Sequence, residues 1–354
     1  MSRSLVWLLV LVILAPCPAA AAEGTVPASW PLFERDDLLE ARIEAPLETL
    51  MDERDDTLYL PGTFSWVDAT GARRALDLEL RARGHYRRQE DICDVPPVRL
   101  NFRKKQVEGT EFAGQDKLKL VTHCQNRREQ YEQYVLREYL AYKIFNVLTE
   151  RSFRARLLRV TWVDTDGENE TSTHYGILLE DDDRLAERLG VQVLEVPHTS
   201  VSDLDPAYAA LVSVFQYMIG NTDYSLIRGE KDEDCCHNIV LLAQATGGHL
   251  AVPYDFDFSG LVDAPYAGPN PKLRIRRVTQ RLYRGPCAYN EHVEAALAGA
   301  RAHEADIMGL VASLDGLDDR SRERVSEFLG EFYEDTADAE SVDDHIVSRC
   351  LSSG

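Results

Sequence analysis

Apolar and polar residues alternate with a period of two through much of residues 58–102. This period is typical of β-strands with one buried face. The strand-like stretches are LYLPGTFSWV, ALDLELRARG and PPVRLNF. Asp68 to Gly71 forms a turn signal between the first two. The pattern therefore predicts a sheet that begins near Leu58.

The next part of the chain predicts one more strand and then a long helix. The stretch DKLKLVTHC alternates, so Lys117 and Lys119 point to the face opposite the leucines. The stretch EQYEQYVLREYLAYKIFNVLTE has apolar residues at helical spacing and predicts an amphipathic helix of about twenty residues. Two further strands are expected in ARLLRVTWVD and THYGILLED. This half of the chain is predicted to be a sheet with one helix.

The second half has a different pattern. An acidic run, Asp181 to Asp183, opens a stretch that extends to Asp205 and resembles a connection between two lobes. Helices are expected from Pro206 to Gly220, near Val293 to Leu314 and from Ser321 to Tyr333. HNIVLL and HLAVPYDF are expected to form two short strands. The chain is therefore predicted to be an α+β protein with a sheet-rich lobe and a mostly helical lobe.

The N-terminus has the features of a secretory signal peptide. MSRSLVWLLVLVILAPCPAAAA combines the positive charge of Arg3, a short apolar core and small residues before the expected cleavage point. The apolar core is about half the roughly 20 residues that span a bilayer. We expect an exported protein, secreted or periplasmic, with no membrane span in the mature chain. A lipoprotein signal ending at Cys17 is the alternative.

Charge narrows the range of partners. The net charge is −21, and loss of Arg3 with the signal leaves −22. A surface this acidic repels phosphate backbones and anionic lipids, so we expect no nucleic-acid partner. With 44% apolar residues the chain can bury a substantial core. The sequence does not indicate an oligomeric state.

Cysteine usage agrees with export. An even set remains after the signal is removed: Cys93, Cys124, Cys235, Cys236, Cys287 and Cys350. Up to three disulfides are therefore expected. Cys93 and Cys124 flank one predicted sheet and are expected to pair, and Cys287 is expected to pair with Cys235 or Cys236. A zinc site built on Cys235, Cys236 and His237 is the alternative, although their spacing is unlike that of structural zinc sites.

Residues 220–260 contain the main candidate chemistry. Asp223 follows an apolar helix, and Asn238 and Asp255 lie at the edges of the two short strands. Carboxylate and amide oxygens at such positions can bind a divalent cation. Asp257 alternates with Asp255, so the two carboxylates are expected on one face, where they would repel unless a cation lies between them. The pattern predicts a metal-dependent phosphoryl-transfer site.

Several motifs together resemble a known family. They are RARG, PPVRLNF, GTEFAGQDKLKLV, the long helix, YGILLED, NTD, HN and YDFDFSG, in that order between Leu78 and Gly260. This order resembles secreted CotH-type kinase-like proteins, and its last motifs also resemble HipA-type kinases and, more distantly, lipid kinases. The resemblance implies a two-lobed protein kinase-like fold, with a sheet-rich N-lobe carrying one long helix and a mostly helical C-lobe. The implied division of the chain is residues 1–22 signal peptide, 23–54 N-terminal extension, 55–185 N-lobe, 186–205 interlobe connection and 206–354 C-lobe.

The resemblance also implies roles for individual residues. It implies that Asp223 orients or accepts the proton of an attacking hydroxyl, and that Asn238 and Asp255, with Asp257 as a further candidate, hold Mg²⁺ against the phosphates of ATP or another nucleoside triphosphate. The nucleotide contacts that it implies are Lys119 or Lys117, Glu138 orienting that lysine, and the loop at Arg83 and Gly84. The implied activity is that of an exported atypical kinase, a transferase that phosphorylates a protein hydroxyl.

Two departures from that family keep other functions open. Asn238 follows Asp223 by fifteen residues, whereas protein kinases separate the corresponding residues by about five. The loop at Arg83 has a single glycine, so Arg83, Arg87 or Arg88 would have to bind the phosphates. One alternative is therefore a catalytically inactive binding or envelope and coat assembly protein. Another is a metal-dependent hydrolase whose ligands are Asp223, His237, Asp255 and Asp257.

Overall fold

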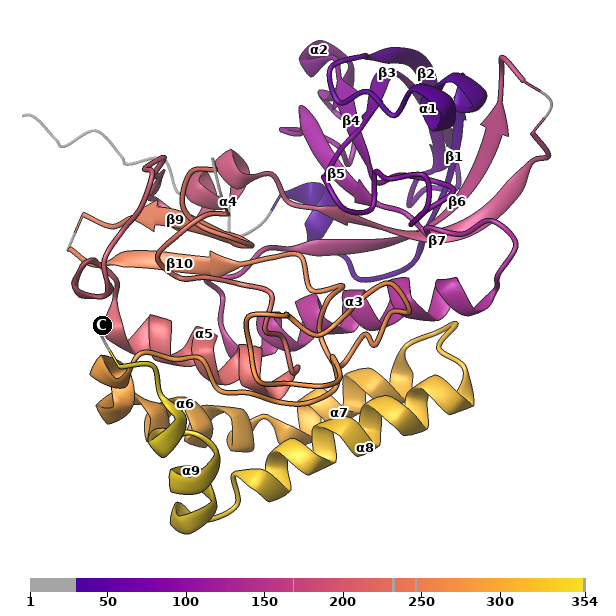
Figure 1. Cartoon of the computed structure of the whole chain (residues 1–354). Helices are drawn as coiled ribbons and strands as arrows, with labels where there is room; N and C mark the ends of the chain where they lie inside the picture. The colour runs from indigo at the N-terminus through magenta and orange to yellow at the C-terminus, as the bar shows by residue number, and fades with distance from the viewer. Residues whose placement is uncertain (1–29, 168, 231–232, 246, 353–354) are drawn as a thin grey trace, which may run out of the picture.

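The computed structural model describes residues 30–167, 169–230, 233–245 and 247–352. The predicted signal peptide, residues 1–22, lies outside these ranges. A seven-stranded closed β-barrel occupies the N-terminal half, and helices cover it on one side (Figure 1). Its strands are β1 (Leu39–Ala45), β2 (Leu60–Val67), β3 (Arg73–Ala82), β4 (Val98–Phe102), β5 (Lys117–Val121), β6 (Ala155–Asp164) and β7 (Ser172–Leu179).

The barrel closes through a strand that the alternation analysis missed. β1 lies in the predicted N-terminal extension and pairs antiparallel with β2 and parallel with β6, where Leu39 is opposite Leu158. Its buried residues alternate along LEARIEA, so the period of two was present in the sequence. Phe64 and Leu80 are fully buried in the barrel interior. The strands predicted between residues 58 and 181 are confirmed.

The expected two-lobed protein kinase-like fold is wrong, although the α+β class is right. The N-terminal strands form a closed barrel in the order β1-β2-β3-β4-β5-β7-β6, not the sheet-rich lobe of a two-lobed kinase. Closure is favoured because it pairs both edges of the sheet and leaves no strand edge open. Two short helices, α1 (Leu47–Glu53) and α2 (Lys104–Val107), accompany the barrel.

The long helix α3 (Gln130–Leu148) lies between the barrel and the C-terminal helices (Figure 1). Thirteen of its nineteen residues are buried, including polar Arg137 and Glu138. The helix is therefore less amphipathic than expected, because the barrel covers one side of it and the C-terminal helices cover the opposite side. Phe145 stacks on Phe215, with ring centroids 4.4 Å apart. This helix joins the two halves through one continuous core.

The C-terminal half combines a small sheet with a group of helices. Its elements are α4 (Asp182–Leu189), β8 (Gln192–Val193), α5 (Pro206–Met218), β9 (Ile239–Ala243), β10 (His249–Pro253), α6 (Asn290–Ala302), α7 (Glu304–Ser313), α8 (Asp319–Asp335) and α9 (Ala339–His345). The three strands are ordered β10-β9-β8. The expected connection at 186–205 therefore contains the end of α4 and the edge strand β8. The expected helix near 293–314 is divided at His303 into α6 and α7.

Three disulfides cross-link the chain. Cys93 pairs with Cys124, which confirms that prediction. Cys287 pairs with Cys350, and Cys235 with Cys236, so the expected partner of Cys287 was wrong. The C-terminal segment lies beside Cys287, and Cys287 N donates a hydrogen bond to Leu351 O there. Disulfides persist in oxidising compartments, so the pairing is compatible with export.

Within the described ranges, no helix combines the length and apolarity needed to span a membrane.

The contribution of β1 can be measured with a core substitution. Ile43 is fully buried between β2 and β6, so Ile43→Ala is expected to lower the free energy of unfolding by about 2–5 kcal/mol. The exposed Glu40 on the same strand provides the control, and Glu40→Ala is expected to change stability by less than about 0.5 kcal/mol. Urea denaturation measures both. Equal, small effects would show that β1 does not close the barrel in solution.

Candidate active site

Asp223 is brought to the site by the segment that leaves α5. Gly220 has a left-handed backbone (φ 62°) that ends the helix. Its carbonyl accepts a hydrogen bond from Gly260 N at 3.1 Å, and a Cβ at Gly220 would come within 2.8 Å of the Phe328 ring. Asn221 Oδ1 then accepts from Asp223 N at 2.9 Å, which forms an Asx turn. The turn after α5 therefore lies beside the segment that follows β10.

Asn238 and Asp255 lie at one end of the β9–β10 ladder. Ile239 is opposite Pro253 in the register. One step further, Tyr254 N donates to Asn238 O at 3.1 Å. Both Asn238 (φ 54°) and Asp255 (φ 61°) have a left-handed backbone, which Asn and Asp tolerate better than most residues and which often occurs at functional sites. The end of the ladder thus carries two oxygen donors.

A cleft of about 720 Å³ brings most of the predicted site residues together. It lies between the loop after β3 and the β8–β10 sheet. Its lining includes Asp223, Asn238, Asp255, Asp257, Arg83 and Gly84. Asp255 and Asp257 do not alternate along a strand as expected, because β10 ends at Pro253. They lie in the turn that follows, and both still line the cleft.

Asp223 is held by two neighbours from the start of β9. His237 Nε2 lies 3.0 Å from Asp223 Oδ1, and Asn238 Nδ2 donates to Asp223 Oδ2 at 3.1 Å and to Asp223 O at 2.7 Å. Burial lowers the pKa of His237, but its hydrogen bond to Asp223 and the charge of that carboxylate outweigh burial and raise the pKa. Because Asn238 uses its nitrogen in these bonds, its Oδ1 remains available for a ligand.

Behind the cleft, Arg87 lies between two buried carboxylates. Its Nη1 is 3.8 Å from Glu138 Oε2 and 3.9 Å from Asp257 Oδ2, and its Nη2 donates to Thr122 O at 2.5 Å. Burial and the charge of Asp255 raise the pKa of Asp257 to about 7. Burial and the charge of Asp257 raise the pKa of Glu138. Negative charge therefore exceeds positive charge in this low-dielectric region.

Neither predicted lysine lines the cleft itself, although Asp182 and Tyr254, which contact Lys119, do. Lys119 Nζ forms an ion pair with Asp182 Oδ1 at 2.8 Å and lies 4.6 Å from the centre of the Tyr254 ring. Lys117 is exposed on β5, opposite Asn101. Glu138 faces Arg87 and not a lysine. Of the three arginines considered from the sequence, Arg83 and Arg87 line the cleft, whereas Arg88 pairs with Asp56.

The donor set fits a hard divalent cation. Asp255 and Asp257 offer carboxylate oxygens and Asn238 an amide oxygen, which are ligands that Mg²⁺ and Mn²⁺ prefer. Glu138 Oε1 is buried with no hydrogen-bond partner among the described residues. A cation beside Asp255 and Asp257 would offset the repulsion that raises the pKa of Asp257.

A second group of potential ligands lies at the rim. One ligand atom each from Glu230, Glu233 and His237 lie within 4.8 Å of one another, and both glutamates are exposed. The alternative zinc site is not formed, because Cys235 and Cys236 are bonded to each other and supply no thiolate.

Two tyrosines that the sequence analysis did not assign to the site also contact its carboxylate segment. Tyr142 on α3 accepts a hydrogen bond from Asp255 N at 2.9 Å, and Tyr266 is hydrogen-bonded to Asp257. Tyr142 lies four residues after Glu138, so helical spacing in the sequence places both side chains on the same face of α3. Tyr266 lies in a loop rich in Pro and Gly, where no periodicity indicates its direction.

Neither protein-family models nor curated protein sequences give a match to this chain.

The raised pKa of Asp257 predicts a pH dependence of stability in metal-free protein. An unfolded Asp has a pKa near 3.9, and folding raises that of Asp257 to about 7. Folding therefore favours the protonated carboxyl. The contribution of Asp257 to the free energy of unfolding is accordingly highest below about pH 4, and it is lost as the pH rises through about 7. Asp257→Asn cannot ionise. Its stability relative to wild type is expected to increase by up to about 4 kcal/mol between pH 4 and pH 7.

Urea denaturation in the presence of EDTA measures this difference. Asp91→Asn, at an exposed position outside the cleft, is expected to run parallel to wild type over the same range. A parallel profile for Asp257→Asn would contradict the assigned environment of Asp257.

Proposed function

We propose that this protein is a metal-dependent phosphotransferase that moves the γ-phosphoryl group of a nucleoside triphosphate, such as ATP, to a hydroxyl of a protein. The observation that carries the proposal is the convergence of Asp223, Asn238 and Asp255 on one cleft. They come from three separate segments, after α5, before β9 and after β10. The proposal rests on the chemistry of this site and not on a kinase-like fold.

Each residue of the site would have a separate role in the reaction. Asn238 Oδ1, Asp255 and Asp257 would hold Mg²⁺, which neutralises phosphate charge and orients the phosphates when bound. Asp223 orients the acceptor hydroxyl and receives its proton. His237 and Asn238 fix the Asp223 carboxylate through their hydrogen bonds. The oxygen of the acceptor then forms the new bond to the γ-phosphorus as the bond from that phosphorus to the leaving nucleoside diphosphate breaks.

Arginine side chains supply the positive charge for the phosphates. Arg83 lines the cleft. Arg87 is buried at the cleft wall and keeps its Nε without a partner within the described ranges. Guanidinium groups bind phosphate oxygens through directed hydrogen bonds. This arrangement supports arginine, and not Lys119, as the phosphate contact.

The first test removes one proposed metal ligand. Asp255→Asn keeps the size of the side chain and removes its charge, so transfer of ³²P from ATP with Mg²⁺ is expected to fall at least about 100-fold. Asp91→Asn is the matched control and is expected to retain wild-type transfer. Protein substrates are supplied as a mixture of dephosphorylated proteins, with autophosphorylation measured in parallel. Equal activity of Asp255→Asn and wild type would overturn the assignment of Asp255.

Nucleotide binding separates this proposal from a non-catalytic binding or envelope and coat assembly role. A ligand at about 100 times its dissociation constant stabilises a protein by about 2.7 kcal/mol. Thermal-shift titration with Mg²⁺ and a non-hydrolysable ATP analogue is therefore expected to raise the Tm of wild type, and Asp255→Asn is expected to reduce that shift. No shift with any magnesium nucleotide would favour the non-catalytic role.

The group at the cleft rim supports a second candidate, a metal-dependent hydrolase. His237 is shared between Asp223 and the two glutamates, Glu230 and Glu233. Imidazole with carboxylates favours a transition metal, whereas the oxygen donors at Asp255 favour Mg²⁺. Elemental analysis of purified protein distinguishes the two, since tightly bound zinc is expected only for the hydrolase.

A further inference from the structure

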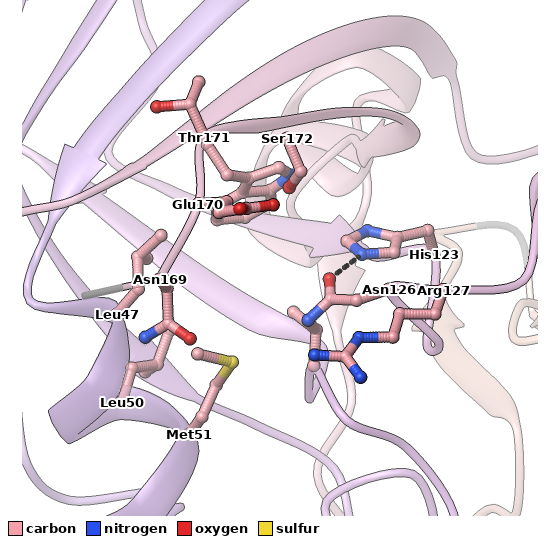
Figure 2. A pocket seen from close by; sticks show the side chains of 12 residues that line it. Leu47, Leu50, Met51, His123, Asn126, Arg127, Asn169, Glu170, Thr171 and Ser172 are labelled. Atoms are coloured by element: carbon pink, nitrogen blue, oxygen red, sulfur yellow. Dashed lines mark hydrogen bonds between the residues drawn. The ribbon is translucent and has the colours of Figure 1, made fainter. Parts of the chain in front are cut away.

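A second pocket lies at the end of the barrel formed by α1, the β6–β7 connection and the loop after β5. Its volume is about 390 Å³. Figure 2 shows Leu47, Leu50 and Met51 on one side, Asn126 and Arg127 on another, and Glu170 with Thr171 and Ser172 on a third. No residue that lines this pocket also lines the cleft at Asp223.

Hydrogen bonds fix the walls formed by α1 and the β6–β7 connection. Asp164 Oδ1 accepts from Leu47 N at 3.0 Å, and Asp166 Oδ1 accepts from Glu48 N at 3.2 Å, which caps the start of α1. Asn169 Nδ2 donates to Asp164 Oδ2 at 2.6 Å. The same carboxylate thus joins the helix to the connection, so these walls are organised without a ligand.

The third wall is fixed by His123 and a disulfide. His123 is almost completely buried, its Nε2 lies 2.8 Å from Asn126 Oδ1, and its ring stacks on His174 at 3.5 Å between centroids. The Cys93–Cys124 disulfide anchors the loop beside it. Burial and the neighbouring His174 lower the pKa of His123 to about 3. His123 is therefore neutral, and its Nδ1 has no partner among the described residues.

Two opposite charges at the pocket have no partner among the residues that the structure describes. Arg127 and Glu170 both line it, and both are exposed. Neither forms an ion pair or hydrogen bond with any residue in the described part of the chain, and they do not pair with each other. Most exposed charged side chains simply contact water. Here the two flank a preformed cavity that also has an apolar wall, formed by Leu47, Leu50, Met51 and the buried Trp162.

We propose that this pocket binds an L-α-amino acid with an apolar side chain. The Arg127 guanidinium would take the carboxylate, the Glu170 carboxylate would take the ammonium group, and the apolar wall would take the side chain. A ligand with a single charge would leave either Arg127 or Glu170 uncompensated. The volume lies at the small end of ligand pockets, which favours a single amino acid over a longer peptide.

A sugar fits these observations less well. Sugar recognition uses the open face of an aromatic ring, but only 5% of Trp162 is exposed. The proposal is independent of phosphoryl transfer, because it uses none of the residues of the cleft.

Isothermal titration with L-leucine, L-methionine and L-phenylalanine tests the proposal. At least one of them is expected to bind wild-type protein below about 10 mM. For that amino acid, the carboxamide lacks the carboxylate and the N-acetyl derivative lacks the ammonium group. Each derivative is expected to bind at least about tenfold more weakly.

Two variants test whether Arg127 binds the carboxylate of the amino acid and Glu170 its ammonium group. Arg127→Gln is expected to bind the amino acid and its carboxamide with equal affinity, and Glu170→Gln to bind the amino acid and its N-acetyl derivative with equal affinity. Arg128→Gln, at the next exposed position and outside the pocket lining, is the control and is expected to bind as wild type does. Both charged positions are exposed, so the unliganded Tm of each variant is expected to match that of wild type.

Three results would overturn the proposal. They are the absence of binding by all three amino acids at about 10 mM, binding that neither Arg127→Gln nor Glu170→Gln alters, and binding of glucose or N-acetylglucosamine by a protein that binds none of the amino acids.

Discussion

The buried guanidinium of Arg87 links the three parts of the molecule that form the cleft. It comes from the loop after β3, donates to the end of β5 at Thr122, and lies beside Glu138 on α3 and Asp257 after β10. A buried charge is stable only when it is paired and hydrogen-bonded. The barrel, the long helix and the segment after β10 therefore have to meet at Arg87, and the cleft is the space left beside that meeting point.

The single positive charge of Arg87 does not balance the negative charge of the carboxylates around the cleft. One guanidinium faces Glu138 and Asp257, and Asp255 adds further negative charge. Burial first, and then this negative charge, raises the pKa values of Glu138 and Asp257. A stable fold can tolerate such an excess by protonating one carboxyl. It can also bind a cation, which would use the oxygen donors of Asn238 and Asp255. The energetic cost of this arrangement is the main reason to regard the cleft as a working site rather than as structural packing.

The pocket at Arg127 and Glu170 differs in its physical character. Its two charges are exposed and balanced, and its buried imidazole is neutral, so it requires no cation. The two sites are nevertheless adjacent in the chain at the end of β5. Thr122 accepts from Arg87 on the cleft side, whereas His123 lines the pocket. The segment that ends β5 therefore contributes to both sites, through the backbone oxygen of Thr122 and the ring of His123.

Local sequence patterns predict the α+β class, six of the seven barrel strands, the long helix and the grouping of Asp223, Asn238, Asp255 and Asp257. These features depend on local periodicity and on oxygen-bearing residues at the ends of elements, which a linear pattern contains. Those patterns do not contain the barrel closure by β1, the pairing of Cys287 with Cys350, or the neighbours of Lys119 and Glu138, which are set by the packing of the folded chain. Each of these depends on which distant segments meet. Lys119 pairs with Asp182 and Glu138 faces Arg87 because strand order and helix packing, not spacing along the chain, set those distances.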